Sequence, residues 1–421
     1  MSNIPSKVIN PREAAFLAVL TFLKEGTFIR ESLDKWQKTH SPSRMDFNLA
    51  LDLASGTVRM GLALDYIAKK IANRTSLSLK VKERALLRTA LYQAVFRKDI
   101  PLYAIGQEAG TLSKKYCHAV FSKFLNAVIR KLGDGVPALP AGKSAEALSI
   151  HYSYPVLLVA YFLKVFGLEK TVDLLQLGNN PPKVMVRLRS LETPEEADKL
   201  ERIPGGPPEM RHLKDAQWLS TLAQSPNFYI QNGTPFLLMS HLSREASLKP
   251  HSILDLCASP GGKTLLAHDL YPEAQLFAND VSSQKMERLR ANCQKYDLDA
   301  VLTCANGEEF VSEQLFDLII VDAPCSNTGV LSKRPEARWR FSEETCKNLE
   351  ETQCKLLRHA ATLLNPHGEI WYLTCSILDF ENEKLIQQVC QENDLHVRTQ
   401  LTIYPTETGL DGGFACALQR K

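Results

Sequence analysis

Two cysteine-bearing segments, fifty residues apart, are the part of this sequence best suited to chemistry. The first is Asp322-Ala-Pro-Cys325-Ser and the second is Thr374-Cys375-Ser, and each follows a short apolar run. A thiolate is a strong nucleophile when its surroundings favour ionisation. A lone cysteine at the end of a strand is usually a packing residue, but two such cysteines favour a reaction that uses a thiol.

A glycine turn precedes both cysteines. Cys257-Ala-Ser-Pro-Gly-Gly262-Lys-Thr264 follows the apolar run 253–256 and leads into a helix-like segment. Glycines at such a turn let the backbone approach a ligand closely. Asp280 follows the next strand-like run, 18 residues after Gly262, where a carboxylate can accept both hydroxyls of a ribose. The pattern predicts a nucleotide-type cofactor.

Three interpretations of this turn compete. Gly262-Lys-Thr264 resembles the end of a phosphate-binding P-loop, but position 257 is Cys where that loop requires Gly. The turn does not match the dinucleotide pattern GxGxxG either. An adenosyl cofactor without a pyrophosphate fits better, and we expect S-adenosylmethionine. A P-loop-like NTPase and an ordinary strand-to-helix turn are the alternatives.

A thiol beside a methyl donor suits methylation of carbon 5 of a cytosine. That carbon becomes nucleophilic only after a thiolate adds to carbon 6; after methylation, a proton leaves carbon 5 and the thiolate is expelled. Asp322 would hold the amidine edge of the base and stabilise its protonated ring nitrogen. The base must be unstacked, which favours single-stranded or looped RNA. The residues alone do not decide which cysteine attacks.

Composition limits the class of protein. The 421 residues suffice for two or three domains. Residues 1–11 contain no apolar stretch and the run 155–163 is too short to span a bilayer, so we expect a cytoplasmic protein without a membrane partner. The ten cysteines form no CxxC pair and no Cys/His cluster, which predicts no metal site.

Charge is distributed unevenly along the chain. Residues 1–143 hold 23 Lys and Arg against 11 Asp and Glu, whereas the remainder is net negative and the whole chain carries +3. The N-terminal third is therefore a candidate for contact with an RNA backbone, and a solvated basic surface is the alternative.

The sequence predicts three domains. Apolar residues recur at helical spacing over 11–133 without strand signals, which indicates an all-α bundle, and a Gly- and Pro-rich linker follows. We expect the helical domain and linker over 1–143 and a small α+β module over 144–234. Over 235–421 short apolar runs alternate with helical segments, which predicts a mostly parallel, Rossmann-like α/β domain.

The three motifs together resemble the signatures of the RNA cytosine-5 methyltransferases. The helical N-terminal third, including Phe124-Leu-Asn-Ala-Val-Ile-Arg130, is similar to a NusB-like RNA-binding domain. The combination resembles the bacterial RsmB (Sun) type, which methylates small-subunit (16S) ribosomal RNA. This resemblance implies a class I methyltransferase domain, S-adenosylmethionine as cofactor, ribosomal RNA as partner and a monomer. Methylation of transfer RNA and a non-catalytic RNA-binding factor remain alternatives.

The resemblance also implies roles for individual residues. Cys375 matches the attacking nucleophile, Cys325 the cysteine that assists release of the methylated base, and Asp322 the acid at cofactor and base. The implied cofactor contacts are Cys257, Ala258, Ser259, Pro260, Gly261, Gly262, Lys263, Asp280, Asn306 and Asp322.

Some positions depart from the family pattern. Asn306 stands where an Asp is usual, Asn327 where a Gly is usual, and Arg189 where an Asn is common. Separately, residues 333–340 place four basic side chains and Trp339 shortly after Cys325. This composition favours contact with RNA phosphates and bases, and a solvated loop is the alternative.

Overall fold

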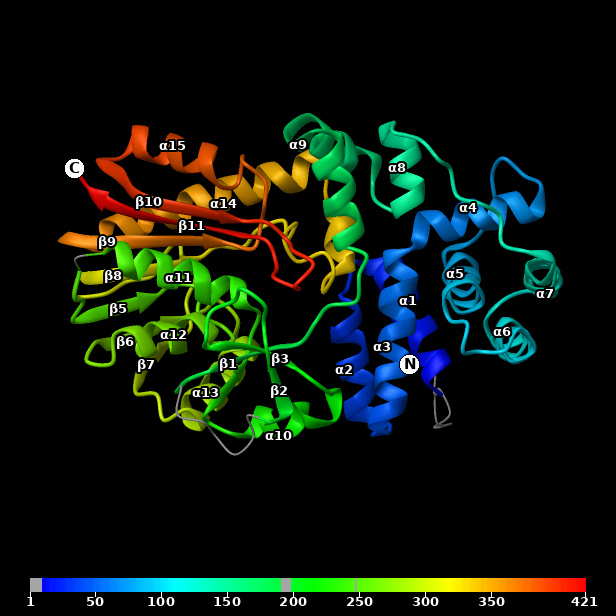
Figure 1. The fold of residues 1–421 in the computed structure, drawn as a ribbon, viewed down its shortest axis with the longest axis horizontal. Helices are drawn as coiled ribbons and strands as arrows, with labels where there is room; N and C mark the ends of the chain where they lie inside the picture. Colours follow the sequence, from blue (N-terminus) through cyan, green and yellow to red (C-terminus); the bar gives the residue numbers. More distant parts are fainter. Residues whose placement is uncertain (1–9, 191–197, 247) are drawn as a thin grey trace. The chain divides into compact units, whose positions relative to one another are not determined.

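A computed structural model of the protein describes residues 10–190, 198–246 and 248–421 (Figure 1). Residues 1–9, most of the N-terminal segment that contains no apolar stretch, lie outside the described ranges. The chain divides into two compact units. The first contains residues up to Asn179 together with Arg334–Phe341, and the second contains Asn180–Lys333 and Ser342–Lys421. Among the described residues, no helix combines the length and the apolar character needed to cross a membrane.

The first unit is helical, as predicted for 11–133. Its elements are α1 (Pro11–Glu25), α2 (Ile29–His40), α3 (Arg44–Arg59), α4 (Gly61–Ala72), α5 (Val81–Phe96), α6 (Leu102–Tyr116), α7 (Ala119–Lys131), η1 (Leu132–Asp134), α8 (Ala145–Tyr152) and α9 (Val156–Leu177). The short helix η4 (Pro335–Arg340) belongs to the same unit. Helices α8 and α9 also lie in this unit. From the sequence we expected their residues in the α+β module over 144–234.

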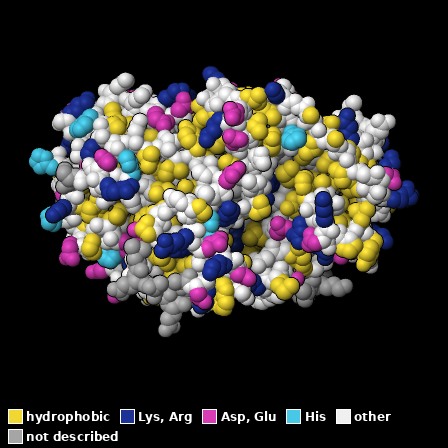
Figure 2. Space-filling view, viewed as in Figure 1, with side chains coloured by type: hydrophobic (Ala, Val, Ile, Leu, Met, Phe, Trp, Pro, Cys, Tyr) yellow, Lys and Arg dark blue, Asp and Glu magenta, His cyan; other side chains and the backbone are white. Residues whose placement is uncertain are grey.

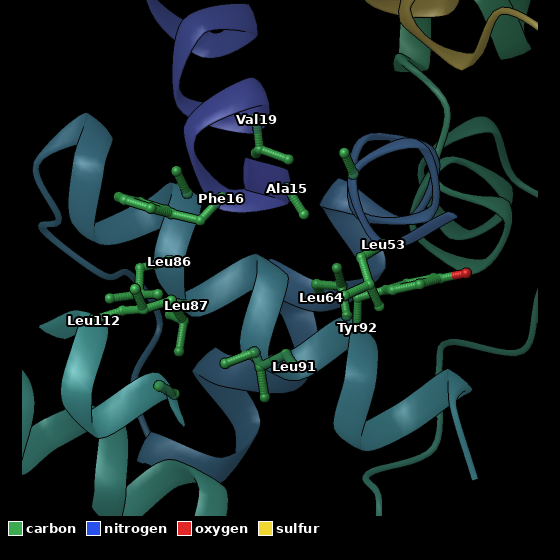
Figure 3. Packing of buried hydrophobic residues seen from close by; sticks show 14 of the residues in the cluster. Ala15, Phe16, Val19, Leu53, Leu64, Leu86, Leu87, Leu91, Tyr92 and Leu112 are labelled. Atoms are coloured by element: carbon green, nitrogen blue, oxygen red, sulfur yellow. The ribbon is translucent and has the colours of Figure 1, made fainter. Parts of the chain in front are cut away.

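Helix α5 lies at the centre of the helical core. Figure 3 shows side chains of α1, α3, α4 and α6 converging on Leu86, Leu87, Leu91 and Tyr92 of α5, all buried. The packing leaves no room at Gly56 of α3, because an added Cβ would lie 1.9 Å from the Tyr92 ring. Burial of this apolar surface is the main stabilising contribution to the bundle.

The second unit begins with a small antiparallel sheet of order β2-β3-β1-β4. Its strands are β1 (Met185–Leu188), β2 (Leu200–Arg202), β3 (Met210–Leu213) and β4 (Phe228–Ile230), accompanied by η3 (Ala216–Trp218) and α10 (Leu219–Gln224). Val186, Leu188 and Phe228 are buried in its own core. These strands supply the β part of the small α+β module that the sequence predicts.

A seven-stranded sheet of order β10-β11-β9-β8-β5-β6-β7 forms the rest of the unit. The strands are β5 (Ser252–Asp255), β6 (Gln275–Asn279), β7 (Ala300–Thr303), β8 (Phe316–Asp322), β9 (Leu364–Thr374), β10 (Leu395–Ile403) and β11 (Gly413–Arg420). β5 to β9 pair in parallel, and β10 and β11 extend the sheet in antiparallel pairing. The mostly parallel α/β prediction is therefore confirmed.

Helices cover both faces of this sheet. They are α11 (Gly233–Glu245), α12 (Gly262–Leu270), α13 (Ser283–Lys295), α14 (Glu343–Thr362) and α15 (Glu383–Glu392). Successive strand residues point to opposite faces, so Ile319 packs in the cluster of α14 and α15 while Ile320 packs in that of α11, α12 and α13. Helices thus pack on both faces of the sheet (Figure 1), and in open α/β sheets of this kind the loops at the strand ends carry the binding site.

Candidate active site

The sequence-predicted residues all follow parallel strands at the carboxyl edge of the large sheet. Residues 257–263 follow β5, Asp280 follows β6 and Asn306 lies beyond β7. Asp322 ends β8, with Cys325 beyond it, and Cys375 comes directly after β9. Because the strand order is β9-β8-β5-β6-β7, these loops are neighbours along one edge. This is where open α/β sheets bind ligands.

The two thiols are in contact. Sγ of Cys325 lies 3.1 Å from Sγ of Cys375. Cys325 is 8% exposed, whereas Cys375 is only partly buried. The hydrogen bond with Cys375, together with burial, raises the pKa of the Cys325 thiol well above its ordinary value. Cys325 therefore keeps its proton at neutral pH, and Cys375 is the more accessible of the two.

A lysine and two carboxylates lie beside the thiols. Nζ of Lys263 donates to Oδ2 of Asp322 at 2.5 Å. Burial disfavours the charged ammonium, but the Asp322 carboxylate more than offsets this effect, so the pKa of Lys263 is raised. Asp255 is 1% exposed and accepts a hydrogen bond from Thr264. Burial raises the pKa of Asp255 to about 7. Lys263 is thus paired with Asp322, and Asp255 is a second, buried acid within its electrostatic reach.

The turn after β5 has the shape that a close ligand requires. Gly261 has φ +103°, a conformation that L side chains rarely adopt, and a Cβ there would lie 2.7 Å from the Leu289 side chain. Asp280 is 4% exposed and holds the turn, because the amide of Ser259 donates to its Oδ2 at 3.2 Å. A bare backbone turn beside a buried acid at the end of the next strand fits an adenosyl group with its ribose.

Asn306 lies on the surface beyond β7. Its Oδ1 accepts a hydrogen bond from the amide of Glu308 at 3.2 Å, which closes the turn. Asp would accept the same bond, so the local structure of this turn is compatible with either residue type.

Asn327 is a functional candidate that sequence reasoning treated only as a departure from the family pattern. Its φ is +61°, in the left-handed region that Gly and, less readily, Asn adopt. Its Oδ1 accepts from the Cys375 thiol at 3.3 Å and its amide donates to the Cys325 carbonyl at 2.7 Å. Asparagine therefore keeps the backbone shape that a glycine would give and adds a contact to each cysteine residue.

Arg189, the other residue that departs from the family pattern, forms an ion pair with an acid. The Arg189 guanidinium donates to Asp269 at 2.8 Å, and Arg187 binds the same carboxylate. Arg189 also lies over the ring of Tyr296, 5.3 Å from its centroid. The arginine is therefore built into the packing between the small sheet and α12.

The expectation that residues 333–340 contact RNA is wrong for its central residues. Arg338 is 0% exposed and donates to the Ser153 carbonyl at 3.2 Å and the Gly178 carbonyl at 3.0 Å. The indole of Trp339 donates to the Val58 carbonyl at 2.9 Å. These side chains are used inside the helical unit, and a buried cation cannot reach a phosphate. Composition could not separate this from RNA contact, because both use arginine and tryptophan.

Charge on the visible surface is mixed. In Figure 2, Lys and Arg side chains are interspersed with Asp and Glu over the face shown. Within the described ranges, no group of three or more His, Cys, Asp or Glu side chains is arranged to hold a metal ion.

Comparisons with known proteins cover both ends of the chain. The 16S rRNA methyltransferase RsmB/F family matches residues 246–419, and the NusB family matches residues 9–134. Ribosomal RNA small subunit methyltransferase B of Shewanella oneidensis is 29% identical over 90% of this chain and 89% of its own length. The probable ribosomal RNA small subunit methyltransferase B of Bacillus subtilis is 27% identical over 99% of this chain and all of its own length.

A solved structure shares the fold over the full length of both chains. The crystal structure of PH0851 superposes with a TM-score of 0.77 at 21% identity. The two families, the whole-length relatives and the shared fold agree with the motifs at the sheet edge. Residues 9–134 therefore resemble the NusB family, residues 246–419 resemble the RsmB/F family, and the chain is an S-adenosylmethionine-dependent RNA methyltransferase.

Proposed function

We propose that this enzyme transfers a methyl group to carbon 5 of a cytosine in small-subunit (16S) ribosomal RNA through a covalent bond between cysteine and cytosine. The observation that carries the proposal is the pair of thiols 3.1 Å apart beside the Lys263–Asp322 ion pair. The names of the relatives favour ribosomal over transfer RNA, and we place the reaction in the cytoplasm with the enzyme as a monomer.

Cys375 is the nucleophile in this mechanism. It is the more exposed thiol, and its sulfur adds to carbon 6 of the cytosine, which makes carbon 5 electron-rich. S-adenosylmethionine, when bound at residues 257–263 with Asp280 and Asn306, supplies an electrophilic methyl group to that carbon. Cys325 assists the final stage, in which the carbon 5 proton is lost and the Cys375 thiolate is expelled.

Asp322 and Lys263 orient the base. Lys263 binds Oδ2 of Asp322, and in the described part of the chain Oδ1 has no hydrogen-bond donor, so that oxygen can accept from a ring nitrogen. The Asp322 side chain is 33% exposed, which leaves it within reach of a base that enters from solvent. A carboxylate held by a fixed cation needs little reorganisation as charge develops on the base.

Two cysteine variants test the roles. Cys375→Ala should reduce methyl transfer to ribosomal RNA by about 10³-fold or more, because the nucleophile is removed. Cys325→Ala should accumulate a protein–RNA adduct that survives denaturing electrophoresis. The exposed Cys304 gives a matched control, and Cys304→Ala should behave as wild type. An adduct in Cys375→Ala would show that the roles are reversed.

Cofactor and substrate need separate measurements. Calorimetry should show binding of S-adenosylmethionine and none of ATP, and the opposite result would favour the P-loop-like interpretation. Bisulfite sequencing of ribosomal and transfer RNA from cells lacking the protein should show one small-subunit cytosine that has lost its methyl group. Loss of a methyl group from transfer RNA alone would overturn the choice of substrate.

A further inference from the structure

A buried carboxylate lies beneath the two cysteine loops. Glu381 is 0% exposed and stands six residues after Cys375. All the donors that reach this carboxylate within the described residues are neutral groups, from Ser326, Ser376 and Gln353. A buried charge held only by neutral donors is costly, and its cost is offset only when its hydrogen bonds are well formed.

The bonds of Glu381 connect one loop to the other. The amide of Ser326, next to Cys325, donates to its Oε1 at 2.8 Å, and the Ser326 hydroxyl donates to its Oε2. The hydroxyl of Ser376, next to Cys375, donates to Oε2 at 2.5 Å. Each loop thus fastens to the same carboxylate through the residue that follows its cysteine. Bonds to a charged acceptor are about twice as strong as neutral ones.

The carboxylate itself is fixed in place. The Tyr372 hydroxyl donates to the Glu381 carbonyl at 2.8 Å, and the side chain of Asn382 donates to the Ser376 carbonyl at 3.0 Å. Gln353 of α14 donates to Oε1 at 3.2 Å and to the Pro324 carbonyl at 2.8 Å. The anchor therefore rests on strand β9 and helix α14, which belong to the core of the sheet.

We propose that Glu381 is a positioning residue that holds the Cys325 and Cys375 loops in register and places a carboxylate beside the two thiols. The inference rests on the proposed function for the roles of the two thiols. The Glu381 charge is one of the causes, after the contact with Cys375 and burial, that raise the pKa of Cys325. With Cys325 protonated, its hydrogen can pass to the Cys375 sulfur as the bond from that sulfur to carbon 6 breaks, and the Cys325 thiolate left behind can take the proton from carbon 5.

Two substitutions separate the effect of the hydrogen bonds between Glu381 and the two cysteine loops from the effect of its charge. Glu381→Ala removes both, whereas Glu381→Gln keeps the shape and can still accept from the Ser326 amide. Glu383→Gln is the matched control, because this carboxylate in the same segment is only partly buried and accepts from Thr402. Single-turnover methylation and alkylation of each thiol by iodoacetamide across pH, followed by peptide mass spectrometry, are measured for all three.

Glu381→Ala should lower the single-turnover rate about 100-fold, the effect of displacing a reacting group by about 1 Å, with KM for S-adenosylmethionine unchanged. Glu381→Gln should lose less activity, and the pH midpoint of Cys325 alkylation should move to lower pH. The Glu383→Gln control should match wild type in rate and in alkylation profile.

If Glu381→Ala and Glu381→Gln keep the wild-type rate and alkylation profiles while only thermal stability falls, the proposal is overturned. If wild type fails to methylate ribosomal RNA but the alkylation midpoint still moves, the proposed function fails and the role of Glu381 stands.

Discussion

At the scale of residues, Lys263 is the cation of the site. The Lys263 ammonium forms an ion pair with Asp322, which raises the pKa of Lys263, and Asp255 raises it further. Asp255 is almost fully buried, and its Oδ1 has no hydrogen-bond donor among the described residues. A charged carboxylate in that position is unfavourable, so Asp255 carries a proton over much of the acidic range.

This environment predicts a pH-dependent stability. The folded-state pKa of Asp255, about 7, lies above its ordinary value of 3.8. The folded state therefore binds the proton more tightly, and the stabilisation is complete below about pH 4 and is lost as pH rises to about 7. Asp255→Asn, which resembles the protonated acid, should gain stability over wild type as pH rises, by up to about 4 kcal/mol at pH 8. Thermal unfolding of both proteins from pH 5 to pH 8 measures the difference.

Asp317 gives a control of opposite sign. Burial raises the pKa of Asp317, but hydrogen bonds from the His251 amide and the Asn365 side chain more than offset this, and the pKa is lowered. Asp317→Asn should therefore lose stability at neutral pH and recover relative to wild type as pH falls through the acidic range. A gap between Asp255→Asn and wild type that does not change with pH would contradict the assignment.

At the scale of elements, the loops after β8 and β9 are joined through backbone atoms. The Gly329 amide donates to the Cys375 carbonyl at 2.9 Å, and the Gly412 amide donates to the Gly329 carbonyl at 2.8 Å. A Cβ at Gly329 would lie 2.4 Å from the Gly412 carbonyl oxygen and 2.8 Å from that of Cys375. Both neighbours are backbone atoms near strand ends, so they cannot move aside cheaply.

Gly329→Ala should therefore separate the cysteine loops. We expect the rate of methyl transfer to fall about 100-fold, because the two thiols lose their alignment, with a smaller loss of thermal stability. Gly106→Ala is the matched control, since its Cβ would meet only Ile129 at 3.8 Å. In the middle of α6 this change should stabilise the protein by up to about 1 kcal/mol. Equal activity of the two variants would refute the expected coupling of the loops.

The sequence was most informative about elements with local patterns. The parallel strands β5, β6, β8 and β9 were predicted from short apolar runs, and their shared carboxyl edge followed from the topology of parallel sheets. The positions of the motif residues were predictable for the same reason. Their roles in catalysis stay predictions.

Long-range features were not predictable. Glu381 lies in the mostly polar run Asp379-Phe-Glu-Asn-Glu-Lys384, in which nothing local marks it as buried, and only the folded chain brings Ser326 to it. The antiparallel pair β10 and β11 and the placement of Arg338 also depend on contacts between distant segments. Nothing local in 333–340 distinguishes a buried guanidinium from one in solvent.

At the scale of the whole molecule, the segment Arg334–Phe341 is a part of the helical unit supplied from within the sequence of the other unit. Its Arg338 donates to the side chain of Asn179 at 2.8 Å and lies over the Tyr154 ring, 3.8 Å from its centroid. The helical unit thus uses a residue far along the chain to satisfy carbonyl groups at the ends of α8 and α9.

Arg338→Met should destabilise the helical unit by about 3 kcal/mol or more, because several buried carbonyls lose a charged donor. Amide hydrogen exchange should become faster in α3, α8 and α9 and stay unchanged in the strands of the large sheet. Arg130→Ala, at an exposed position of α7, should leave exchange as in wild type. Unchanged protection in Arg338→Met would show that η4 contributes little to the unit.

The inserted segment has a consequence for synthesis on the ribosome. A unit made of residues up to Asn179 would ordinarily fold as soon as it left the exit tunnel. Here its last piece, ending at Phe341, is translated 162 residues later, roughly ten to thirty seconds at typical rates of chain elongation. During that interval the helical domain of the nascent chain lacks the hydrogen bonds that Arg338 donates to the Ser153 and Gly178 carbonyls. The domain that is translated first is completed only after much of the catalytic sheet has been made.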